Sequence, residues 1–324
     1  MSDLAERLND LARLQLGAPG IDNLRRLSGG ATQELWRFEL KDFDRTVLVL
    51  RRSPGGAAGF VETAGLEVEA ELLRLAKTAG APVPEVRHVL RKSDGAGQGF
   101  IMSFVQGETL GGRIVKDPAL APAREILARQ CGEILARIHT IAPDSLPSLK
   151  RSTPAELVDE WRRRYLASDW PRPVFEVAFR WLDAHCPAPP TSPRLVHGDF
   201  RNGNLMIGPD GVRAVLDWEL AHVGDPLEDL AWICVNAWRF GALDKPVGGF
   251  GTREDLYAGY EAAGGETVDR DRAAWWEVFG TLRWGVMCAG MTAMFRGADR
   301  TVERAVIARR TSETEIDLMR LLAA

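Results

Sequence analysis

Cysteine, histidine and tyrosine are scarce in this chain, whose 324 residues include 4 Cys, 5 His and 3 Tyr. The cysteines stand far apart, at Cys131, Cys186, Cys234 and Cys288, so no two have the short spacing of zinc ligands. Scattered cysteines do not indicate a disulfide framework either. We therefore expect four reduced, mostly buried thiols in a cytoplasmic protein.

The signatures of several common protein classes are also missing. No run of about eighteen apolar residues occurs, and the charged residues 1–7 do not resemble a signal peptide, so no membrane association is expected. The net charge of −4 and the isoelectric point of about 5.9 provide no basic field for nucleic acid. The Gly-x-Ser-x-Gly, Walker A and Gly-x-Gly-x-x-Gly motifs are absent, which disfavours hydrolase, P-loop and Rossmann folds.

The composition that remains is that of a globular protein, with 45% hydrophobic and 27% charged residues, and the length suggests two lobes. We place the boundary at Gln106–Gly107, where the sequence pattern changes. Before it, the patterns predict helices over 3–16 and 61–79 and strands over 34–40, 46–52, 86–90 and 99–105. After it they predict helices over 122–140, 154–168, 173–186, 252–264, 269–296 and 301–322, with a further helix after Asp225.

The most informative stretch runs from Leu195 to Glu219. The turn residues Gly208-Pro-Asp-Gly211 separate two apolar segments, which predicts a hairpin with strands over 204–207 and 212–217. Asp199 enters this hairpin, and Asn204 and Asp217 stand near its open end. The sequence therefore predicts two carboxylates and an amide close together.

Carboxylate and amide oxygens are hard ligands that suit Mg²⁺ better than zinc. One carboxylate can hold the metal while the other faces a hydroxyl, which is the division of labour in phosphoryl transfer. Asp and Asn are also common turn and cap residues, and for any single position that explanation stays open. The complete pattern, His-Gly-Asp followed by Asn204 and by Asp-Trp-Glu, favours a functional site.

These motifs resemble those of a known family. His197-Gly-Asp199 with Asn204, Leu216-Asp-Trp-Glu219, Gly224-Asp-Pro226 and Asp229-Leu-Ala231 are similar to the motifs of small-molecule kinases of the aminoglycoside phosphotransferase and choline kinase type. The Gly-Gly-Ala loop and the strand ending Val-Leu-Arg-Arg look like the branch that is fused to acyl-CoA dehydrogenases. The resemblance implies an α+β, two-lobed, protein-kinase-like fold. Residues 1–106 would form a nucleotide-binding lobe with an antiparallel sheet and a helix, and residues 107–324 a mainly helical catalytic and substrate lobe.

The resemblance also implies roles for individual residues. Asp199 would orient the substrate hydroxyl or accept its proton, Arg201 would touch the transferring phosphoryl group, and Asn204 and Asp217 would hold Mg²⁺. The ATP-binding residues would be Ser28, Gly29, Gly30, Ala31 and Thr32 over the phosphates, Ser103, Phe104 and Val105 at the adenine, and Glu69 paired with the phosphate-binding cation. Taken alone, Gly29-Gly30 also fits a plain tight turn, and helical spacing does not show whether Glu67, Glu69 or Glu71 faces inward.

One position departs from the family pattern. Arg51 stands where the phosphate-binding Lys is expected, and an Arg can still contact phosphate through two N–H groups. Asp225 has two interpretations, a buried brace for the catalytic loop or a helix N-cap. We expect His197 to donate to nearby backbone, Glu219 to support or extend the metal site, and residues such as Trp238 and Trp284 to line the substrate cleft.

The leading hypothesis is an ATP- and Mg²⁺-dependent phosphotransferase that acts on a hydroxyl of a small molecule. The alternative is a pseudokinase that binds nucleotide without transfer, which Arg51 motivates. A protein kinase is less favoured, because few residues separate Asp217 from Gly224 and leave no room for an activation segment. The chain lacks the dense acidic pocket that an aminoglycoside would need, so we expect a hydroxylated metabolite, with an acyl-CoA-like compound as one option.

Overall fold

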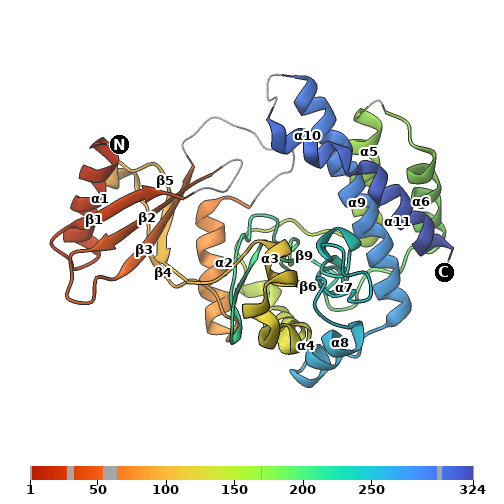
Figure 1. Ribbon diagram of the computed structural model, residues 1–324, viewed down its shortest axis with the longest axis horizontal. Coiled ribbons are helices and arrows are strands. Elements are labelled where there is room, and N and C mark those ends of the chain that lie inside the picture. Colours follow the sequence, from red (N-terminus) through yellow and green to blue (C-terminus); the bar gives the residue numbers. More distant parts are fainter. Residues whose placement is uncertain (1, 28–32, 54–63, 169, 298–300, 324) are drawn as a thin grey trace.

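The computed structural model describes residues 2–27, 33–53, 64–168, 170–297 and 301–323. It has a sheet at one end and a larger helical body at the other, as Figure 1 shows. This arrangement confirms the predicted α+β, two-lobed, protein-kinase-like fold, with an antiparallel N-terminal sheet and a mainly helical C-terminal part. The predicted phosphate loop, Ser28 to Thr32, lies outside the described residues.

The N-terminal sheet is antiparallel throughout, in the order β1-β2-β3-β5-β4. Its strands are β1 (Ile21–Arg26), β2 (Glu34–Leu40), β3 (Val47–Ser53), β4 (Val86–Val89) and β5 (Gln98–Ser103). Strand β1 was not predicted, because its sequence IDNLRR is polar and mostly exposed and so shows no clear alternation. This edge strand pairs with β2 through its backbone, and Ile21 is its one buried residue.

Two helices cover the two faces of this sheet. Helix α1 (Ser2–Gln15) buries Leu8 in one core together with Ile101 of β5. Helix α2 (Leu66–Thr78) packs on the other face, where it shares a core with Phe100. Neighbouring strand residues point to opposite faces, which explains why Phe100 and Ile101 belong to different cores. The core around α2 continues into the helical body, so this helix joins the two parts of the molecule.

The helical body is built around one long buried helix, α9, which contacts α5, α6, α7, α10 and α11. Its helices are α3 (Gly111–Lys116), α4 (Ala121–His139), α5 (Pro154–Ala167), α6 (Pro173–Ala184), α7 (Leu227–Trp232), α8 (Arg253–Ala262), α9 (Arg270–Arg296), α10 (Val302–Arg309) and α11 (Thr311–Leu322). The short α3 was not predicted. The helix predicted over 301–322 is in fact two helices, which separate at Arg310, where the Thr311 hydroxyl donates to the carbonyl of Ala308.

The segment between α6 and α7 contains two short pairs of antiparallel strands. Strands β7 (Leu205–Gly208) and β8 (Gly211–Val215) form the predicted hairpin, and β6 (Arg194–Val196) pairs with β9 (His222–Gly224) on either side of it. The second pair was not predicted, because three-residue strands are too short to show alternation. Together the two pairs bring residues 197–204 and 216–221 next to each other.

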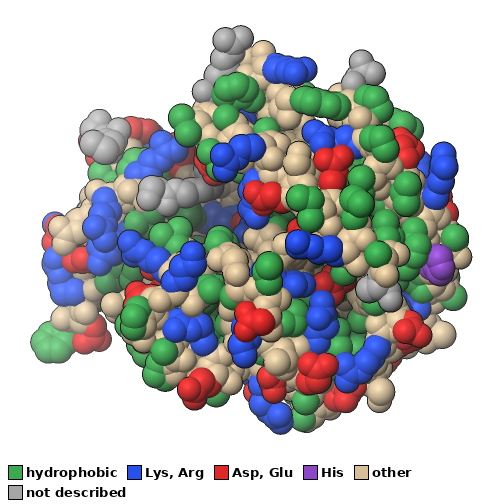
Figure 2. Space-filling view, turned by 45° about the vertical axis from the view of Figure 1, so that its right-hand side comes forward, with side chains coloured by type: hydrophobic (Ala, Val, Ile, Leu, Met, Phe, Trp, Pro, Cys, Tyr) green, Lys and Arg blue, Asp and Glu red, His purple; other side chains and the backbone are tan. Residues whose placement is uncertain are grey.

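Helix α9 is the one helix among the described residues that is long and apolar enough to cross a membrane, by length and composition alone. Most of its apolar stretch, 61%, is buried inside the molecule, and a core helix of this kind meets the same criteria. All four cysteines are free, as expected. On the face shown in Figure 2, acidic and basic side chains are intermixed over the helical body, in keeping with the small net charge.

Candidate active site

The catalytic loop predicted by the His-Gly-Asp motif lies between β6 and β7. Gly198 has a φ of 80°, and a Cβ at this position would lie 2.5 Å from the carbonyl oxygen of Leu220. Only glycine fits both this backbone conformation and this close approach. The motif therefore needs its glycine so that the loop can press against the segment that follows Asp217.

Asp199 is held in place by three N–H donors. Its Oδ1 accepts from Arg201 Nε at 3.0 Å and from Trp232 Nε1 at 2.8 Å. Its Oδ2 accepts from Asn204 Nδ2 at 2.6 Å. Each carboxylate oxygen has two lone pairs, so Oδ2 keeps one with which to accept a further hydrogen bond. The side chain is 15% exposed, which leaves one oxygen available to a hydroxyl group.

Asp229, and not Asp225, braces the catalytic loop. Its fully buried carboxylate accepts the backbone N–H of His197 at 2.7 Å and that of Gly198 at 2.9 Å. His139 Nε2 lies 3.2 Å from the same carboxylate. Burial alone would raise the pKa of Asp229, but the hydrogen bond and the charge of His139, aided by the His197 contacts, lower it overall.

Asp225 has a different function. Its Oδ1 accepts the N–H of Leu227 at the start of α7, and its Oδ2 accepts Trp276 Nε1 at 2.8 Å and the side chain of Arg272. The brace interpretation of Asp225 is therefore wrong. Asp225 does stand at the start of α7, but one residue before the N-cap, which is Pro226. Asp225 therefore joins α7 to α9, and none of its side-chain hydrogen bonds within the described residues reaches the loop 197–204.

His197 has the structural role expected from the sequence. Its Nε2 lies 3.1 Å from the carbonyl oxygen of Leu216, to which it can only donate, and its Nδ1 accepts the backbone N–H of Asp199 at 3.2 Å. These partners require the neutral tautomer with a proton on Nε2. Burial lowers the pKa of His197, against the opposing effect of Asp229 and other nearby carboxylates.

The hairpin brings Asn204 and Asp217 together as predicted. The N–H of Leu216 donates to the carbonyl of Asn204 at 2.8 Å, so Asp217 follows directly on the strand beside Asn204. Asp217 has a φ of 63°, which turns its side chain out of the strand direction. Because Asn204 Nδ2 donates to Asp199, its Oδ1 remains the free acceptor. The two oxygens proposed as metal ligands therefore belong to neighbouring residues.

Arg51 connects the two parts of the molecule. Its Nη2 lies 2.6 Å from Asp217 Oδ1 and 3.9 Å from Glu219 Oε2. Its Nε lies 3.0 Å from Glu69 Oε2, although the two atoms are not aligned for a hydrogen bond. Of the three glutamates on α2, Glu69 is the buried one, while Glu67 and Glu71 are exposed. The structure thus pairs Glu69 with Arg51, the cation in the place of the expected Lys.

Two carboxyl groups in this cluster have strongly raised pKa values. Burial raises the pKa of Glu69 to about 7, with Arg51 opposing and Asp217 adding to the rise. Burial and the neighbouring Asp217 raise the pKa of Glu219 to about 7 as well. Burial would lower the pKa of Arg51, but the surrounding carboxylates raise it overall, so Arg51 stays charged.

The predicted adenine-binding segment has only part of its backbone available. The N–H of Ser103 donates to Glu85 and that of Phe104 donates to Val47, at 2.9 and 3.1 Å. These two N–H groups already donate within the N-terminal lobe and cannot also donate to adenine. The groups of this segment that remain able to pair with adenine are its carbonyl groups and the N–H of Val105. Within the described residues, this N–H has no acceptor.

Arg201 holds Asp199 as well as facing the site. Besides its bond to Asp199, its Nη1 donates to the carbonyl of Asn202 at 2.9 Å, and its guanidinium stacks 4.4 Å from the ring of Trp238. Gly203, with a φ of 103°, makes room for it, since a Cβ there would lie 2.4 Å from Arg201 Nη1. The contact with a transferring phosphoryl group remains a prediction, and Nη2 is the atom left for it.

Trp238 does not line an open cleft. It is 4% exposed and packs in a cluster with Trp232 and Trp284, with ring centroids 5.4 and 4.9 Å away. The cluster supports Asp199 through Trp232. The expectation that Trp238 lines the substrate cleft is therefore wrong, because the ring is buried against Arg201 and the two other indoles.

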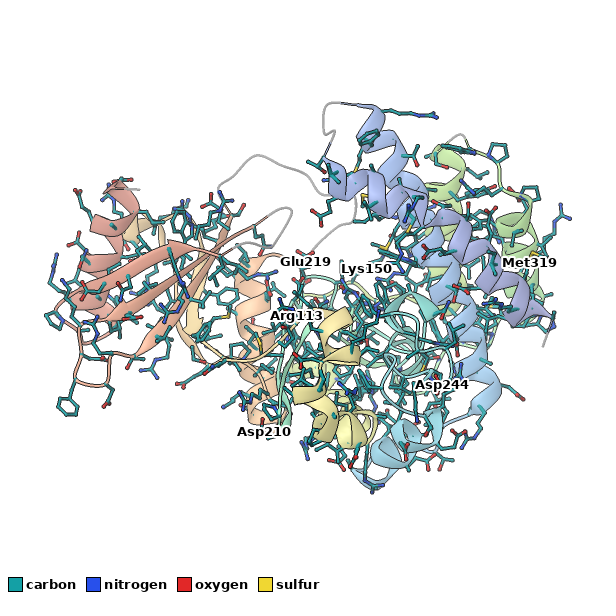
Figure 3. The ribbon with its side chains drawn as sticks, in the orientation of Figure 1. Arg113, Lys150, Asp210, Glu219, Asp244 and Met319 are labelled. Atoms are coloured by element: carbon teal, nitrogen blue, oxygen red, sulfur yellow. The ribbon has the colours of Figure 1, made fainter. Side chains whose placement is uncertain are left out.

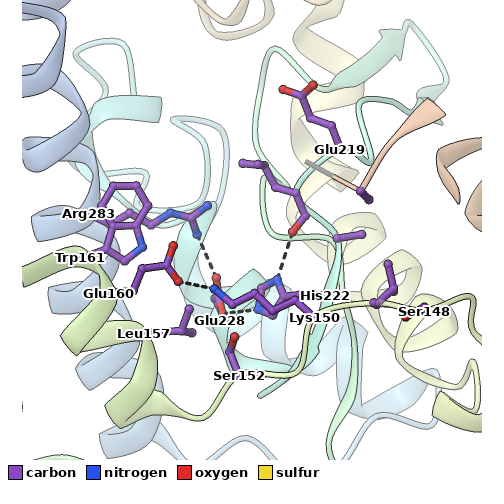
Figure 4. A pocket seen from close by; sticks show the side chains of 14 residues that line it. Ser148, Lys150, Ser152, Leu157, Glu160, Trp161, Glu219, His222, Glu228 and Arg283 are labelled. Atoms are coloured by element: carbon purple, nitrogen blue, oxygen red, sulfur yellow. Dashed lines mark hydrogen bonds and ion pairs between the residues drawn. The ribbon is translucent and has the colours of Figure 1, made fainter. Parts of the chain in front are cut away.

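A cavity of about 190 Å³ lies beside the segment 219–222, between the loop before α5, helix α5 and helix α9. Figure 4 shows its polar lining, which includes Lys150, Glu160, Glu219, Glu228 and Arg283. Glu219 and Lys150 are labelled in Figure 3, near the junction of sheet and helical body. No sequence pattern predicts this cavity, since its walls come from four separate parts of the chain.

Within the described ranges, no group of three or more His, Cys, Asp and Glu side chains could hold a metal ion by itself. Asn204 and Asp217 supply one amide and one carboxylate, which is too few ligands for a closed protein site. This donor set fits Mg²⁺, which takes one or two carboxylates and completes its shell with phosphate oxygens and water. The residues therefore fit a metal that arrives with a nucleotide.

Comparison with known proteins agrees with this geometry. Two hundred residues are 34% identical to acyl-CoA dehydrogenase family member 10 of Mus musculus, covering 58% of this chain and 18% of that protein. A similar stretch of 197 residues is 32% identical to acyl-CoA dehydrogenase family member 11 of Homo sapiens, covering 56% and 24%. The chain thus spans about a fifth to a quarter of the length of these curated relatives.

Solved structures share the fold over nearly the whole chain. A candidate aminoglycoside phosphotransferase from Ralstonia eutropha has a TM-score of 0.71 at 21% identity, covering 96% of this chain and 95% of that one. A choline/ethanolamine kinase family protein from Mesorhizobium loti has a TM-score of 0.64 at 22% identity, covering 100% and 98%. A spectinomycin phosphotransferase, solved with ADP and spectinomycin, has a TM-score of 0.63 at 15% identity, covering 95% and 94%.

A family model described as the phosphotransferase enzyme family matches residues 23–276, which include the sheet, the catalytic loop and the hairpin. The resemblance noted in the sequence motifs is thereby confirmed. The chain belongs to the phosphotransferase enzyme family.

Proposed function

We propose that this protein transfers the terminal phosphoryl group of ATP, together with Mg²⁺, to a hydroxyl group of a small molecule. The observation that carries the proposal is the arrangement of Asp199. Its carboxylate is fixed by three N–H donors and keeps one oxygen lone pair for a hydroxyl. It also stands beside Asn204, the residue that would hold the metal together with Asp217. Phosphoryl transfer depends mainly on such positioning.

Each residue has a defined task in this reaction. Asp199 Oδ2 accepts a hydrogen bond from the acceptor hydroxyl, orients it, and takes up its proton as the new bond forms. Asn204 Oδ1 and the Asp217 carboxylate would hold Mg²⁺. When bound, the metal neutralises charge on the phosphates. Arg201 keeps Asp199 oriented through its Nε–H.

Two observations support ATP as the donor. Arg51 presents a guanidinium between the sheet and the hairpin, where it can pair with phosphate oxygens. One solved relative in the same fold binds ADP. The acceptor is a small molecule, because the described chain has few residues between Asp217 and β9 and no segment there to dock a protein substrate.

The test is the variant Asp199→Asn, with Asp210→Asn as control. Asp210 lies in the exposed turn of the same hairpin and forms an ion pair with Arg213. Transfer of label from [γ-³²P]ATP to a pooled metabolite extract is measured, and products are identified by mass. Asp199→Asn should lower turnover by about 10²–10⁴-fold with the fold intact, while Asp210→Asn keeps it. Equal turnover in Asp199→Asn and wild type would refute the assignment.

One observation favours a second candidate, a nucleotide-binding protein without transfer. The bond between Arg51 Nη2 and Asp217 Oδ1, at 2.6 Å, occupies one oxygen of the residue that would hold Mg²⁺. Such a protein would bind ATP but transfer nothing to any hydroxyl compound in the extract. Calorimetric ATP binding, with and without Mg²⁺, separates the two candidates when combined with the transfer assay.

A further inference from the structure

A buried ionic network lies behind the catalytic loop, and its three residues lie outside the sequence motifs. Arg283 of α9 places its Nη1 2.9 Å from Glu228 Oε1 of α7. Glu228 Oε2 in turn lies 3.1 Å from His222 Nε2 of β9. Figure 4 shows both contacts. All three side chains are at least nine-tenths buried, so they are costly to place there unless each is paired.

The network reaches the catalytic loop through Arg283. Its Nη2 donates to the carbonyl oxygen of Gly198 at 3.0 Å, directly before Asp199 in the chain. Its guanidinium also stacks 4.6 Å from the ring of Trp232. The Nε1–H of Trp232 donates to Asp199 Oδ1. Arg283 therefore contacts both the backbone and the indole that fix the orientation of Asp199.

We propose that Arg283 is a positioning residue for Asp199, held in place by Glu228 and His222. The inference rests on the proposed phosphotransferase function, because it assigns Arg283 to the geometry of that reaction. Arg283 touches no group of the reaction itself. It fixes the position of the Gly198 carbonyl and of the Trp232 ring at once, and small displacements of a reacting carboxylate lower the rate strongly.

The geometry explains why arginine is needed at this position. The guanidinium is a planar fork with several N–H groups, so it can donate to Glu228 and to Gly198 while its face lies on Trp232. A lysine ammonium is a single point of charge and cannot make all three contacts together. His222 donates from both ring nitrogens, to Leu220 and to Glu228, which fixes the glutamate that orients Arg283.

The test compares Arg283→Lys and Arg283→Met with Arg272→Met in the full chain. Arg272 is a matched control, because it lies on the same helix and forms an ion pair with the buried Asp225, and within the described residues its side chain makes no hydrogen bond to the catalytic loop. Both Arg283 variants should lower kcat by about 10–100-fold and leave the KM for ATP unchanged. Arg272→Met should lower stability and leave kcat near that of the wild type.

A second comparison asks whether Arg283 acts through Trp232. Trp232→Phe keeps an aromatic ring under the guanidinium but removes the N–H that Asp199 accepts. If the two residues act on the same carboxylate, the double variant Arg283→Lys/Trp232→Phe should lose less kcat than the product of the two single losses. Losses that simply multiply, or a kcat loss in Arg272→Met equal to that in Arg283→Lys, would overturn the proposal.

Hydrogen exchange keeps the inference testable apart from the reaction. The amides of the peptide 195–204 should exchange at least about tenfold faster in Arg283→Met than in Arg272→Met. If the wild type transfers no phosphoryl group, the proposed function fails, and the exchange result alone decides whether Arg283 fixes the loop. If the wild type is active and Arg283→Lys matches it in kcat and exchange, the positioning role is wrong and the function stands.

Discussion

Glu69 should make the stability of this protein depend on pH in a direction opposite to most carboxylates. Its pKa is raised to about 7 from an ordinary value of 4.5, chiefly by burial. Between these pH values the folded protein holds a proton on Glu69 that the unfolded chain has lost. The folded state then binds more protons, so the free energy of unfolding falls as pH rises through this window.

The size of the effect follows from the two pKa values. One pKa unit corresponds to about 1.4 kcal/mol, so a rise from 4.5 to about 7 is worth about 3 kcal/mol. This contribution is complete below pH 4.5 and is lost once the pH passes about 7. Glu69 Oε1 also accepts the N–H of Trp218 at 3.3 Å. This hydrogen bond favours the charged form, and the pKa of about 7 already includes its effect.

The assay is urea denaturation of the wild type and of Glu69→Gln at several values between about pH 4 and pH 8. Glutamine does not titrate, so the variant should lack the loss of about 3 kcal/mol that Glu69 contributes. Glu67→Gln, on the exposed side of the same helix, should keep the wild-type profile. Parallel profiles for the wild type and Glu69→Gln would show that Glu69 does not titrate in this window and would refute the reasoning.

Two further substitutions test the supports of the site. Asp229→Asn places an amide where the carboxylate accepts two backbone N–H groups and faces His139, so it should lower the free energy of unfolding by about 3–5 kcal/mol in urea, whereas the exposed Asp210→Asn should change it by less than about 1. In Arg51→Lys the ammonium group cannot bridge Glu69 and Asp217 together, so the Asp217 carboxylate should be freer to bind metal. Calorimetry at saturating ATP should then show Mg²⁺ binding about 3–10-fold more tightly. Arg52→Lys, whose partner is Glu34, should leave that affinity unchanged, and equal affinity in both variants would contradict the prediction.

Much of the candidate site could be predicted from the sequence because the residues proposed to act in it are close in the chain. Asp199, Asn204 and Asp217 fall within one loop and one hairpin, and turn residues fix their order in space. Short-range geometry of this kind follows from local rules. The fold could be predicted for a related reason, since β2 alternates clearly between buried and half-buried positions and the later helices have regular apolar spacing.

The supports of the site could not be predicted, because they depend on contacts between distant segments. Asp225 and Asp229 stand four residues apart in similar surroundings, and the sequence does not show which of them meets the catalytic loop. In the structure α7 turns Asp229 toward His197, while Asp225 faces α9. Arg283 lies 85 residues from Gly198 in the chain, and no motif marks a pair at that separation.

Arg51 shows how the structure changes the meaning of a sequence departure. As a replacement for lysine it suggests weakened nucleotide binding. In the structure its fork reaches Glu69 on α2 and Asp217 on the hairpin simultaneously, which one ammonium group could not do. The same guanidinium therefore joins the two lobes, and in the proposed function it would also face the phosphates of the nucleotide. In the proposed reaction, phosphate oxygens would replace Asp217 as a partner of Arg51, and Mg²⁺ would replace Arg51 as the partner of Asp217. No charge would then be left unpaired, so Arg51 is consistent with an active phosphotransferase.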